Sequence, residues 1–272
     1  MKFLLCLSLS LMALFAEDKG CFVDENSQNI IFVKDGETKS LGLKEKIYKD
    51  QRCAFDESSF YVANLNNEVV KVASEKEFLF ALPNVGCKVS NILLDKEKIY
   101  VACDMANVVT IAIFDKSSKK FISKNFNNVY KISSFLPLSE GVFFTSFNGK
   151  AFLLDSKLNA KEHKSVGFAP ISACKFSDDE IFIGFRNGEI LDLKSGAKKQ
   201  VLRSKISALA CAGDEVLVAG EDGVIYKFDK SFKLKGKKEL FSGEIKEIFI
   251  DKNVLVGVDL SNKIKSLEIN SF

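Results

Sequence analysis

The sequence lacks the residues on which many catalytic and metal sites depend. Its 272 residues include no tryptophan, three prolines, three methionines and a single histidine, His163. One histidine excludes a metal site built on several histidines, and the absence of a GxSxG elbow argues against a serine hydrolase. No clustered Asp-x-Asp-x-Asp-Gly loop points to calcium. His163 stands in the polar segment 161–164, which is typical of a solvated outer strand or loop.

The seven cysteines are scattered singly along the chain. No two have the CxxC spacing, which excludes a thioredoxin-like couple, a zinc ribbon and a CxxCH haem attachment. Three fall in the first strand of a repeat described below, where a small apolar side chain packs well, so burial as an unpaired hydrophobe is the favoured interpretation. Disulfides in an oxidising compartment are the alternative. Spacing leaves open the connectivity among Cys21, Cys53, Cys87, Cys103, Cys174 and Cys211.

The first residues have the order of an export signal. Lys2 precedes the apolar run 3–15, and Ala16 is followed by two acidic residues. This order predicts a cleavable signal peptide over residues 1–16. The run is too short to span a bilayer comfortably, because a spanning helix needs about 20 apolar residues. Neither Cys6 nor Cys21 has the small, apolar context of a lipoprotein signal, so we expect a soluble periplasmic chain without a lipid anchor.

The remaining residues, 17–272, predict one domain, since no Pro/Ser/Gly-rich linker divides them. The chain has 39 basic and 36 acidic residues, and they are evenly mixed along the sequence. Such a balance gives no basic stripe for nucleic acid. We therefore expect a monomer with no nucleic-acid partner and no membrane span.

A repeated hairpin organises the chain. Residues 181–190 and 216–225 superimpose as an apolar strand, a turn dipeptide and a second apolar strand. The dipeptides Asn187-Gly188 and Asp222-Gly223 supply the positive φ that tight hairpin turns need. The second turn residue marks weaker copies elsewhere, and the markers stand at positions 28, 67, 107, 149, 188, 223 and 262.

The markers are separated by 39, 40, 42, 39, 35 and 39 residues. Another apolar segment precedes each hairpin and a polar strand often follows it, which makes four strands per repeat. A period near 40 with an apolar inner strand and a wet outer strand is typical of a β-propeller blade. The sequence thus predicts an all-β fold, a single propeller of about seven four-stranded blades.

The two ends of the chain bear on blade number. The first copy begins near its second strand, and the last stops after its third, at residues 267–270. We expect strands from the two termini to close the ring, because unpaired edges invite aggregation. If the strands of the two termini form one merged blade, the ring has six blades. If they form two short blades, it has seven, which is the number that we favour. A ring of eight blades is the other alternative. A membrane barrel is disfavoured by polar residues that alternate back from Phe272, and a parallel β-helix by the long period.

The segments 181–196 and 216–230 resemble the repeat of quinoprotein-type propellers, and more distantly WD40 repeats. The resemblance covers nearly the whole mature chain but departs from both families, because the docking tryptophan and the WD dipeptide are absent. Twenty-five phenylalanines are expected to fill the same gaps. In size, export signal and repeat type the chain also resembles the NapL-type accessory proteins encoded with periplasmic nitrate reductases.

The acidic residues give no cluster for catalysis. They are expected to cap turns, and they include Asp95, Asp115, Asp155, Asp178, Asp179, Asp214 and Asp251. We predict no catalytic, cofactor-binding or metal-binding residue, although a calcium site made of carboxylates alone stays open.

The leading hypothesis is therefore a non-catalytic periplasmic scaffold that binds a partner protein through a face of blade loops, as an accessory factor of a reductase such as nitrate reductase would. One alternative is a quinoprotein-like or lactonase-like enzyme or ligand binder. Another is an outer-membrane assembly factor. Neither the partner nor the binding face follows from the sequence.

Overall fold

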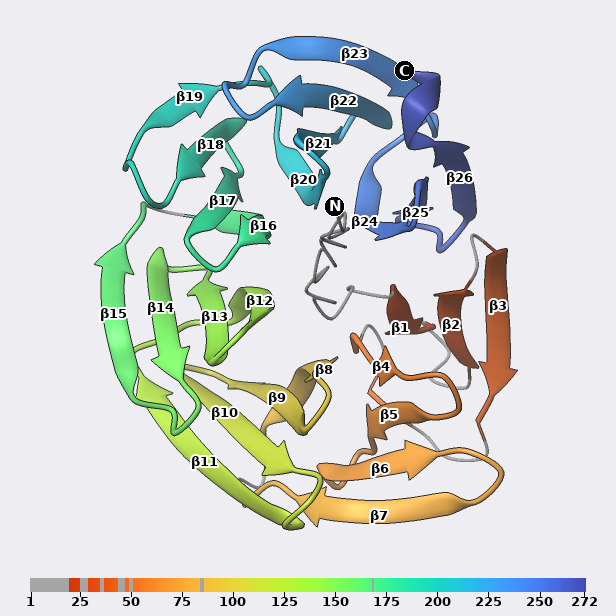
Figure 1. The fold of residues 1–272 in the computed structure, drawn as a ribbon, viewed down its shortest axis with the longest axis vertical. Coiled ribbons are helices and arrows are strands. Elements are labelled where there is room, and N and C mark those ends of the chain that lie inside the picture. Colours follow the sequence, from red (N-terminus) through yellow and green to blue (C-terminus); the bar gives the residue numbers. More distant parts are fainter. Residues whose placement is uncertain are drawn as a thin grey trace, which may run out of the picture.

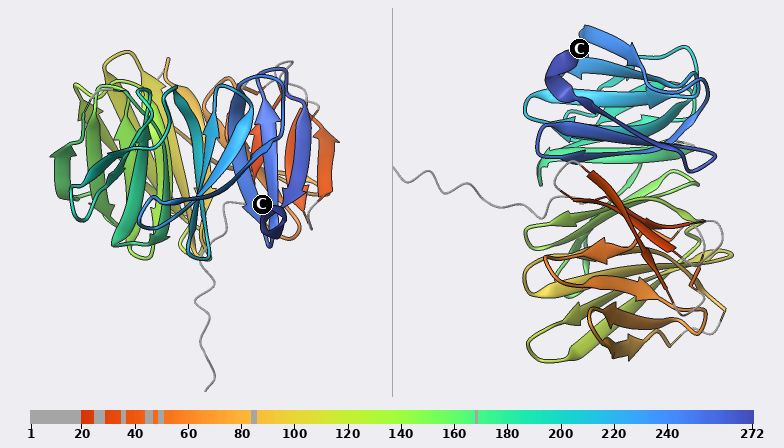
Figure 2. Two further views of the ribbon diagram at one scale, coloured as in Figure 1. Left: turned by 90° about the horizontal axis from the view of Figure 1, so that it is seen from above. Right: turned by 90° about the vertical axis from the view of Figure 1, so that its right-hand side faces the viewer.

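The computed structural model describes residues 20–24, 29–34, 37–43, 47–48, 51–83, 86–167 and 169–272. The predicted signal peptide lies outside these ranges. Seven antiparallel sheets stand around a central axis, which confirms an all-β propeller with seven blades (Figure 1). Figure 2 shows that the ring is shallow, with the strands running across its thickness. Over the described ranges, no helix is long and apolar enough to cross a membrane.

Within the described ranges, five blades have four strands and the two at the chain ends have three. Blade 1 contains β1 (Cys21–Val23), β2 (Asn29–Lys34) and β3 (Glu37–Gly42), and blade 2 contains β4 (Ala54–Phe55), β5 (Phe60–Ala63), β6 (Glu68–Val72) and β7 (Lys76–Ala81). Blade 3 contains β8 (Lys88–Leu94), β9 (Lys98–Met105), β10 (Val108–Asp115) and β11 (Lys120–Asn127), and blade 4 contains β12 (Ile132–Leu138), β13 (Gly141–Ser146), β14 (Lys150–Asp155) and β15 (Ala160–Ser165). Blade 5 contains β16 (Pro170–Ser177), β17 (Glu180–Phe185), β18 (Glu189–Asp192) and β19 (Lys198–Gln200), and blade 6 contains β20 (Ile206–Ala212), β21 (Glu215–Gly220), β22 (Val224–Asp229) and β23 (Leu234–Glu239). Blade 7 contains β24 (Ile245–Asp251), β25 (Val254–Asp259) and β26 (Ile264–Glu268), and the short 3-10 helix η1 (Ile269–Ser271) follows it.

Burial changes from the middle of a blade to its rim. In blade 4 every residue of the second strand, β13, is buried. In blade 3 every residue of the outer strand, β11, is exposed except Phe126. Middle strands are covered on both faces by neighbouring blades, so they need continuous apolar runs, whereas outer strands are bathed by solvent. The predicted pattern of apolar inner and wet outer strands is confirmed.

The turns between second and third strands, here called middle turns, have the expected backbone. Gly149, Gly188 and Gly223 have φ values of 81°, 86° and 78°, and Asn67 and Asn262 have 60° and 58°. The marker at 107 differs, since the positive φ falls on the preceding residue, Ala106. A left-handed residue at these positions is what allows each tight hairpin to close.

Five of the marker residues also attach their blade to the next connection along the chain. The carbonyl oxygen of Gly188 accepts hydrogen bonds from the N–H groups of Val201 and Leu202, at 3.0 and 3.1 Å. Equivalent bonds reach the carbonyls of Asn67, Asn107, Gly149 and Gly223. Five repeats therefore use one position for two purposes, to turn the hairpin and to hold the connection to the following blade.

The described buried apolar side chains gather in seven clusters, one at each interface between neighbouring blades. Phenylalanines fill several of them, as expected for a propeller without tryptophan. The rings of Phe80 and Phe114 stack between blades 2 and 3 with centroids 5.1 Å apart, and Phe182 meets Phe232 between blades 5 and 6 at 5.3 Å. Aromatic pairs of this kind add stabilisation beyond their buried area.

Blade 1 has no inner strand of its own among the described residues, and the segment 51–53 pairs with β1 in its place. The N–H of Val23 donates to the carbonyl of Gln51 at 2.9 Å, and the N–H of Cys53 donates to that of Cys21 at 3.1 Å. Between them, Arg52 pairs on its other side with β8 of blade 3. The segment 51–53, which leads into β4, therefore hydrogen-bonds to the blades on both sides of its own.

The seam between blades 1 and 7 is made by side chains. Phe22 stacks on Phe249 with ring centroids 6.5 Å apart, and Arg52 Nε lies 3.5 Å from Glu247 Oε1. Over the described part of the chain, the apolar cluster at this seam has three buried members, Phe22, Phe249 and Val258. The termini therefore form two short blades, which confirms that alternative, and they close the ring by packing.

All six cysteines of the described chain form disulfides, so the favoured interpretation as unpaired hydrophobic residues was wrong. The pairs are Cys21–Cys53, Cys87–Cys103 and Cys174–Cys211. The first joins blade 1 to the segment before β4, the second lies within blade 3, and the third joins the inner strands of blades 5 and 6. The first and third pairs depend on segments that become neighbours only when successive blades pack together. Three disulfides are typical of an exported protein.

Candidate functional site

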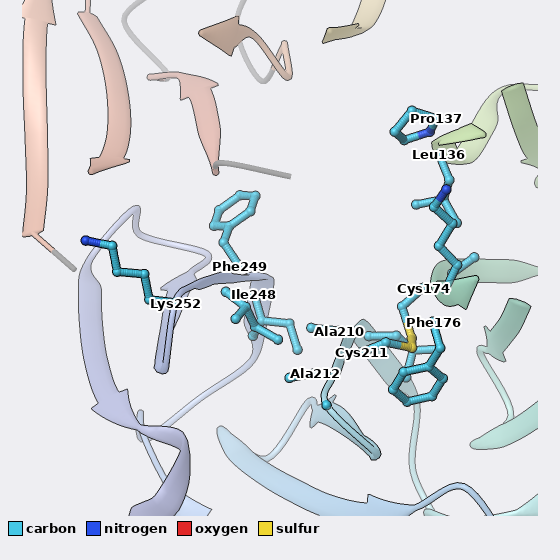
Figure 3. Close-up of a pocket in the computed structure, with 15 residues that line it drawn as sticks. Leu136, Pro137, Cys174, Phe176, Ala210, Cys211, Ala212, Ile248, Phe249 and Lys252 are labelled. Carbon is cyan, nitrogen blue, oxygen red and sulfur yellow. A yellow bond between two sulfur atoms is a disulfide. The ribbon is translucent and has the colours of Figure 1, made fainter. Parts of the chain in front are cut away.

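The inner strands of four blades surround a pocket of about 330 Å³ beside the ring axis. The lining residues come from β12, β16, β20 and β24, and from the turns at the ends of β20 and β24. Figure 3 shows Phe249 and Lys252 on one side of this space and Cys174, Phe176 and Cys211 on the other. The pocket therefore lies between the carboxyl-terminal halves of the inner strands.

Its lining is mainly apolar. Small and aliphatic side chains predominate, and the two charged residues on the wall are Lys175 and Lys252. Lys175 is held back by an ion pair, since its Nζ lies 2.8 Å from Oδ1 of Asp178. The Cys174–Cys211 disulfide fixes the separation of β16 and β20 at the wall. A rigid apolar hollow of this kind takes up an apolar side chain or a small apolar group by the hydrophobic effect.

Beside the pocket, Asp178 has a lowered pKa: burial raises it, but the hydrogen bonds with Lys175 and Ser139 together outweigh that effect. The other groups with perturbed pKa values do not line the pocket. Burial raises the pKa of Asp104, although the N–H of Ile132 donates to its Oδ1 at 2.9 Å and opposes the shift. Burial and a hydrogen bond to Asp95 raise the pKa of Tyr100. The hydrogen bond to Asp222 raises the pKa of Tyr226 to about 12. Because Asp104 in β9 bonds to β12, it ties blade 3 to blade 4.

Several predicted turn acids cap turns as expected. Asp95 accepts from the N–H groups of Glu97 and Lys98 at 2.8 and 2.7 Å, and Asp115 and Asp155 do the same two to four residues downstream. Asp178 instead accepts from the N–H of Ser139 in the neighbouring blade at 2.6 Å. Aspartate favours such turns because its short side chain reaches the backbone N–H groups that follow it.

The other predicted residues do not meet at the pocket. Asp214 pairs with Lys230 at 3.3 Å, Asp179 is exposed, and Asp251 is buried at the end of β24. His163 lies in the outer strand β15, opposite Phe152 in the strand register. Within the described ranges, no group of three or more His, Cys, Asp or Glu residues could hold a metal ion.

Sequence reasoning missed the pocket residues. Ala173, Ala210 and Ala212 read as ordinary members of inner strands, and nothing in one repeat distinguishes a side chain that faces the axis from one that faces the next blade. A comparison between repeats holds the available signal, because Ala210 of β20 takes the position that Phe249 has in β24. The small side chains leave the hollow.

Comparison with known proteins supports the fold alone. No family model and no curated protein sequence matches this chain. Among solved structures, 1027 chains match it. One is the crystal structure of the computationally designed Ika8 protein, with a TM-score of 0.64 and 13% sequence identity over 89% of this chain and 80% of that chain. At this identity the likeness carries no function.

Proposed function

We propose that this protein is a non-catalytic exported scaffold that binds a partner protein at the mouth of its central pocket. The observation that carries the proposal is the pocket itself, an apolar hollow of about 330 Å³ whose wall has aliphatic, aromatic and two lysine side chains. A partner that inserts one large apolar side chain would bury it fully, and such anchors supply most of the affinity in protein interfaces.

We further propose a periplasmic location and a partner among the exported reductases, such as nitrate reductase. The location is supported by the predicted signal peptide and by three disulfides. The choice of partner is supported by the resemblance in size and repeat type to NapL-type accessory proteins.

The test compares three forms of the affinity-tagged protein after mild cross-linking in the native cell. Ala212 is half-buried on the pocket wall, so Ala212→Phe fills the hollow. Ala160 is exposed at the start of an outer strand, so Ala160→Phe is the matched control. We expect one stoichiometric partner, identified by mass spectrometry, with the wild type and with Ala160→Phe but not with Ala212→Phe.

Capture of the same partner by Ala212→Phe would place the interface elsewhere and refute the pocket proposal. A cofactor, a calcium ion or a catalytic turnover that accompanies the purified protein would refute the non-catalytic assignment. If the captured partner is a reductase subunit, the finer proposal stands; if it belongs to another class, only the scaffold proposal stands.

A further inference from the structure

The outer edge of blade 7 differs from that of its neighbours. Blades 2 to 6 each end at the rim on a fourth strand, whereas blade 7 ends on its third strand, β26, within the described ranges. Figure 1 shows β26 between the outer strands β23 of blade 6 and β3 of blade 1. No described residue therefore fills the position of a fourth strand in blade 7.

The pairing of β26 with β25 decides which backbone groups face that position. The N–H of Ile269 donates to the carbonyl of Asn253 at 2.9 Å, at the end of the ladder between the two strands. In an antiparallel ladder the bonded pairs recur at every second residue, so the odd-numbered residues of β26 bond to β25. The even-numbered residues present their N–H and C=O groups to the open side, and these are Ile264, Ser266 and Glu268.

These groups are available to another strand. The carbonyl of Glu268 accepts from the hydroxyl of Ser271 at 2.6 Å, but the backbone groups of Ile264 and Ser266 that face outward have no hydrogen-bond partner among the described residues. The outer strands β7, β15 and β23 each carry a bulge, which protects a sheet edge from a further strand. The register of β26 is regular over residues 264–268, so this edge can extend the sheet.

The two faces of β26 differ in chemistry. Lys265 lies on the face toward blade 6, with its Nζ 5.2 Å from the centroid of the Phe241 ring, and it has no ion-pair partner among the described residues. Ile264 lies on the face toward blade 1, where it is half-buried against the apolar cluster of the seam. Glu268, on the same face, accepts from Asn253 Nδ2 at 3.0 Å. A fourth strand would thus meet an ammonium group on one face and an apolar side chain on the other.

We propose that β26 binds an extended segment of a partner protein as a fourth, antiparallel strand of blade 7. Acidic side chains of this segment alternate with β-branched apolar ones, so that a carboxylate lies opposite Lys265 and an apolar side chain extends the cluster at Ile264. In strand addition the main-chain hydrogen bonds supply affinity and the alternating side chains supply specificity. The edge lies on the rim and the central pocket beside the axis, so this inference goes beyond the proposed function and does not rest on it.

A second copy of the chain fits this edge less well. Residues that bond across an antiparallel pair lie opposite each other, so the even-numbered residues of β26 would face the even-numbered residues of the other copy. Lys265 would then lie opposite an odd-numbered residue, and none of the odd-numbered residues of β26 is acidic. The charge of Lys265 is matched only by a segment of different sequence.

The test measures binding of fluorescein-labelled octapeptides of alternating valine and glutamate to the purified protein by fluorescence anisotropy. One peptide is unmodified, one is N-methylated on every valine and one on every glutamate, so all have the same charge. In the proposed arrangement the valines lie opposite Ile264, Ser266 and Glu268, and their N–H groups bond to β26. The N–H groups of the glutamates point away from the protein.

We expect N-methylation of the valines to weaken binding at least about tenfold, because several hydrogen bonds are lost together. N-methylation of the glutamates should change the affinity by less than about threefold. Equal weakening by both modifications, weakening by the glutamate modification alone, or no binding of the unmodified peptide would overturn the proposal.

Variants of the protein locate the binding site. Ser266→Pro removes an outward N–H and leaves the bonds to β25 in place, so it should weaken binding about tenfold. Lys265→Gln should weaken it about threefold, and the matched control Lys120→Gln, on the exposed outer strand β11, should leave it unchanged. Circular dichroism melting establishes that each variant folds, and the methylated peptides test the proposal on the wild type alone.

Equal affinities of Lys265→Gln and Lys120→Gln for the unmodified peptide would overturn the match of charge at the edge. Sedimentation velocity of the wild type, with and without the peptide, tests the second copy as the occupant. We expect a sedimentation coefficient that does not change with protein concentration. A dimer that the peptide dissociates would show that the chain pairs with itself at β26 and would overturn the proposal.

Discussion

Gly188 and Gly196 share a left-handed backbone but differ in what surrounds them. Their φ values are 86° and 74°. A Cβ atom on residue 188 would lie 2.2 Å from the carbonyl oxygen of Leu202, whereas one on residue 196 would have no neighbour within 4 Å. The first glycine is needed for space and for conformation, and the second for conformation alone.

We predict that Gly188→Ala lowers the free energy of unfolding much more than Gly196→Ala. The control loses about 1–2 kcal/mol, the cost of a left-handed alanine. Gly188→Ala should lose about 3 kcal/mol or more, because the connection to blade 6 must also move. Urea unfolding followed by fluorescence measures both values. Equal losses would show that the contact with Leu202 has no weight in stability.

Single residues were predictable where local chemistry decides their role. The dipeptide Asn187-Gly188 predicts a hairpin turn, because only a few residue types tolerate positive φ. The cysteines were not predictable, because Cys174 and Cys211 become neighbours only when two blades pack side by side. The sequence pattern of one repeat does not show which cysteines of neighbouring blades come close together.

Hairpins between third and fourth strands carry a common cap. Asp115, Asp155 and Asp229 each end a third strand and accept hydrogen bonds from the residues of the turn that follows. These bonds favour the charged carboxylate and lower its pKa. The N–H and hydroxyl groups of Ser117 and Ser118 bring the pKa of Asp115 from 3.8 to about 2. The pKa values of Asp155 and Asp229 are lowered by the same kind of bond.

We predict a loss of stability in acid that these hairpins share. A carboxyl group whose folded pKa lies below its unfolded pKa stabilises the fold above the unfolded value, and this contribution disappears as the pH falls through the folded value. The free energy of unfolding should therefore fall as the pH drops from about 4 toward about 2. Asp115→Asn keeps an oxygen for the turn but does not titrate, so its loss over this interval should be smaller than that of the wild type.

Urea midpoints at about pH 5 and about pH 2 measure this difference. Asp179→Asn is the control for the loss of one carboxylate, since Asp179 is an exposed turn residue in blade 5. An acid-induced loss in Asp115→Asn as large as that of the wild type would contradict the prediction.

Strands and hairpins were largely predictable, because their apolar runs and turn residues repeat at a fixed period. The segment 51–53 was not. It hydrogen-bonds to blade 1 and to blade 3 although it leads into blade 2. Blade 1 has no inner strand of its own within the described ranges, so the segment 51–53 takes that place, and this depends on how the blades are packed in the ring and not on any one repeat.

Among the described residues, the seam has the fewest buried apolar side chains. Six of the seven interfaces have clusters of eight or more such residues, and the interface of blades 1 and 7 has three. Gly20 lies against Phe249 there, and a Cβ on residue 20 would lie 2.3 Å from that ring. By contrast, the nearest atom to a Cβ on Gly42, at the other end of blade 1, is 3.8 Å away.

We predict that Gly20→Ala opens the seam and that Gly42→Ala does not. Overpacking at residue 20 should lower the free energy of unfolding by about 1–3 kcal/mol. Hydrogen exchange followed by mass spectrometry should show faster exchange in β1 to β3 and in β24 to β26, with β12 to β15 unchanged. Uniformly faster exchange in all blades would show instead that the ring opens as one cooperative unit.

The architecture of the whole molecule was predictable, and its surfaces were not. Seven markers at a regular period determine a closed ring of known strand order. The central pocket is assembled from four different blades, so no linear window of the sequence contains it.

The Cys174–Cys211 disulfide has a consequence for how the chain withstands cutting. The bond bridges the connection 201–205, where Arg203 is exposed. If trypsin nicks the chain at Arg203, the two fragments stay covalently joined and migrate as one species until they are reduced. A nick at exposed Lys131, between blades 3 and 4, has no disulfide across it. After a cut at Arg203 the disulfide keeps the two fragments covalently joined, whereas after a cut at Lys131 only non-covalent packing between blades holds them together.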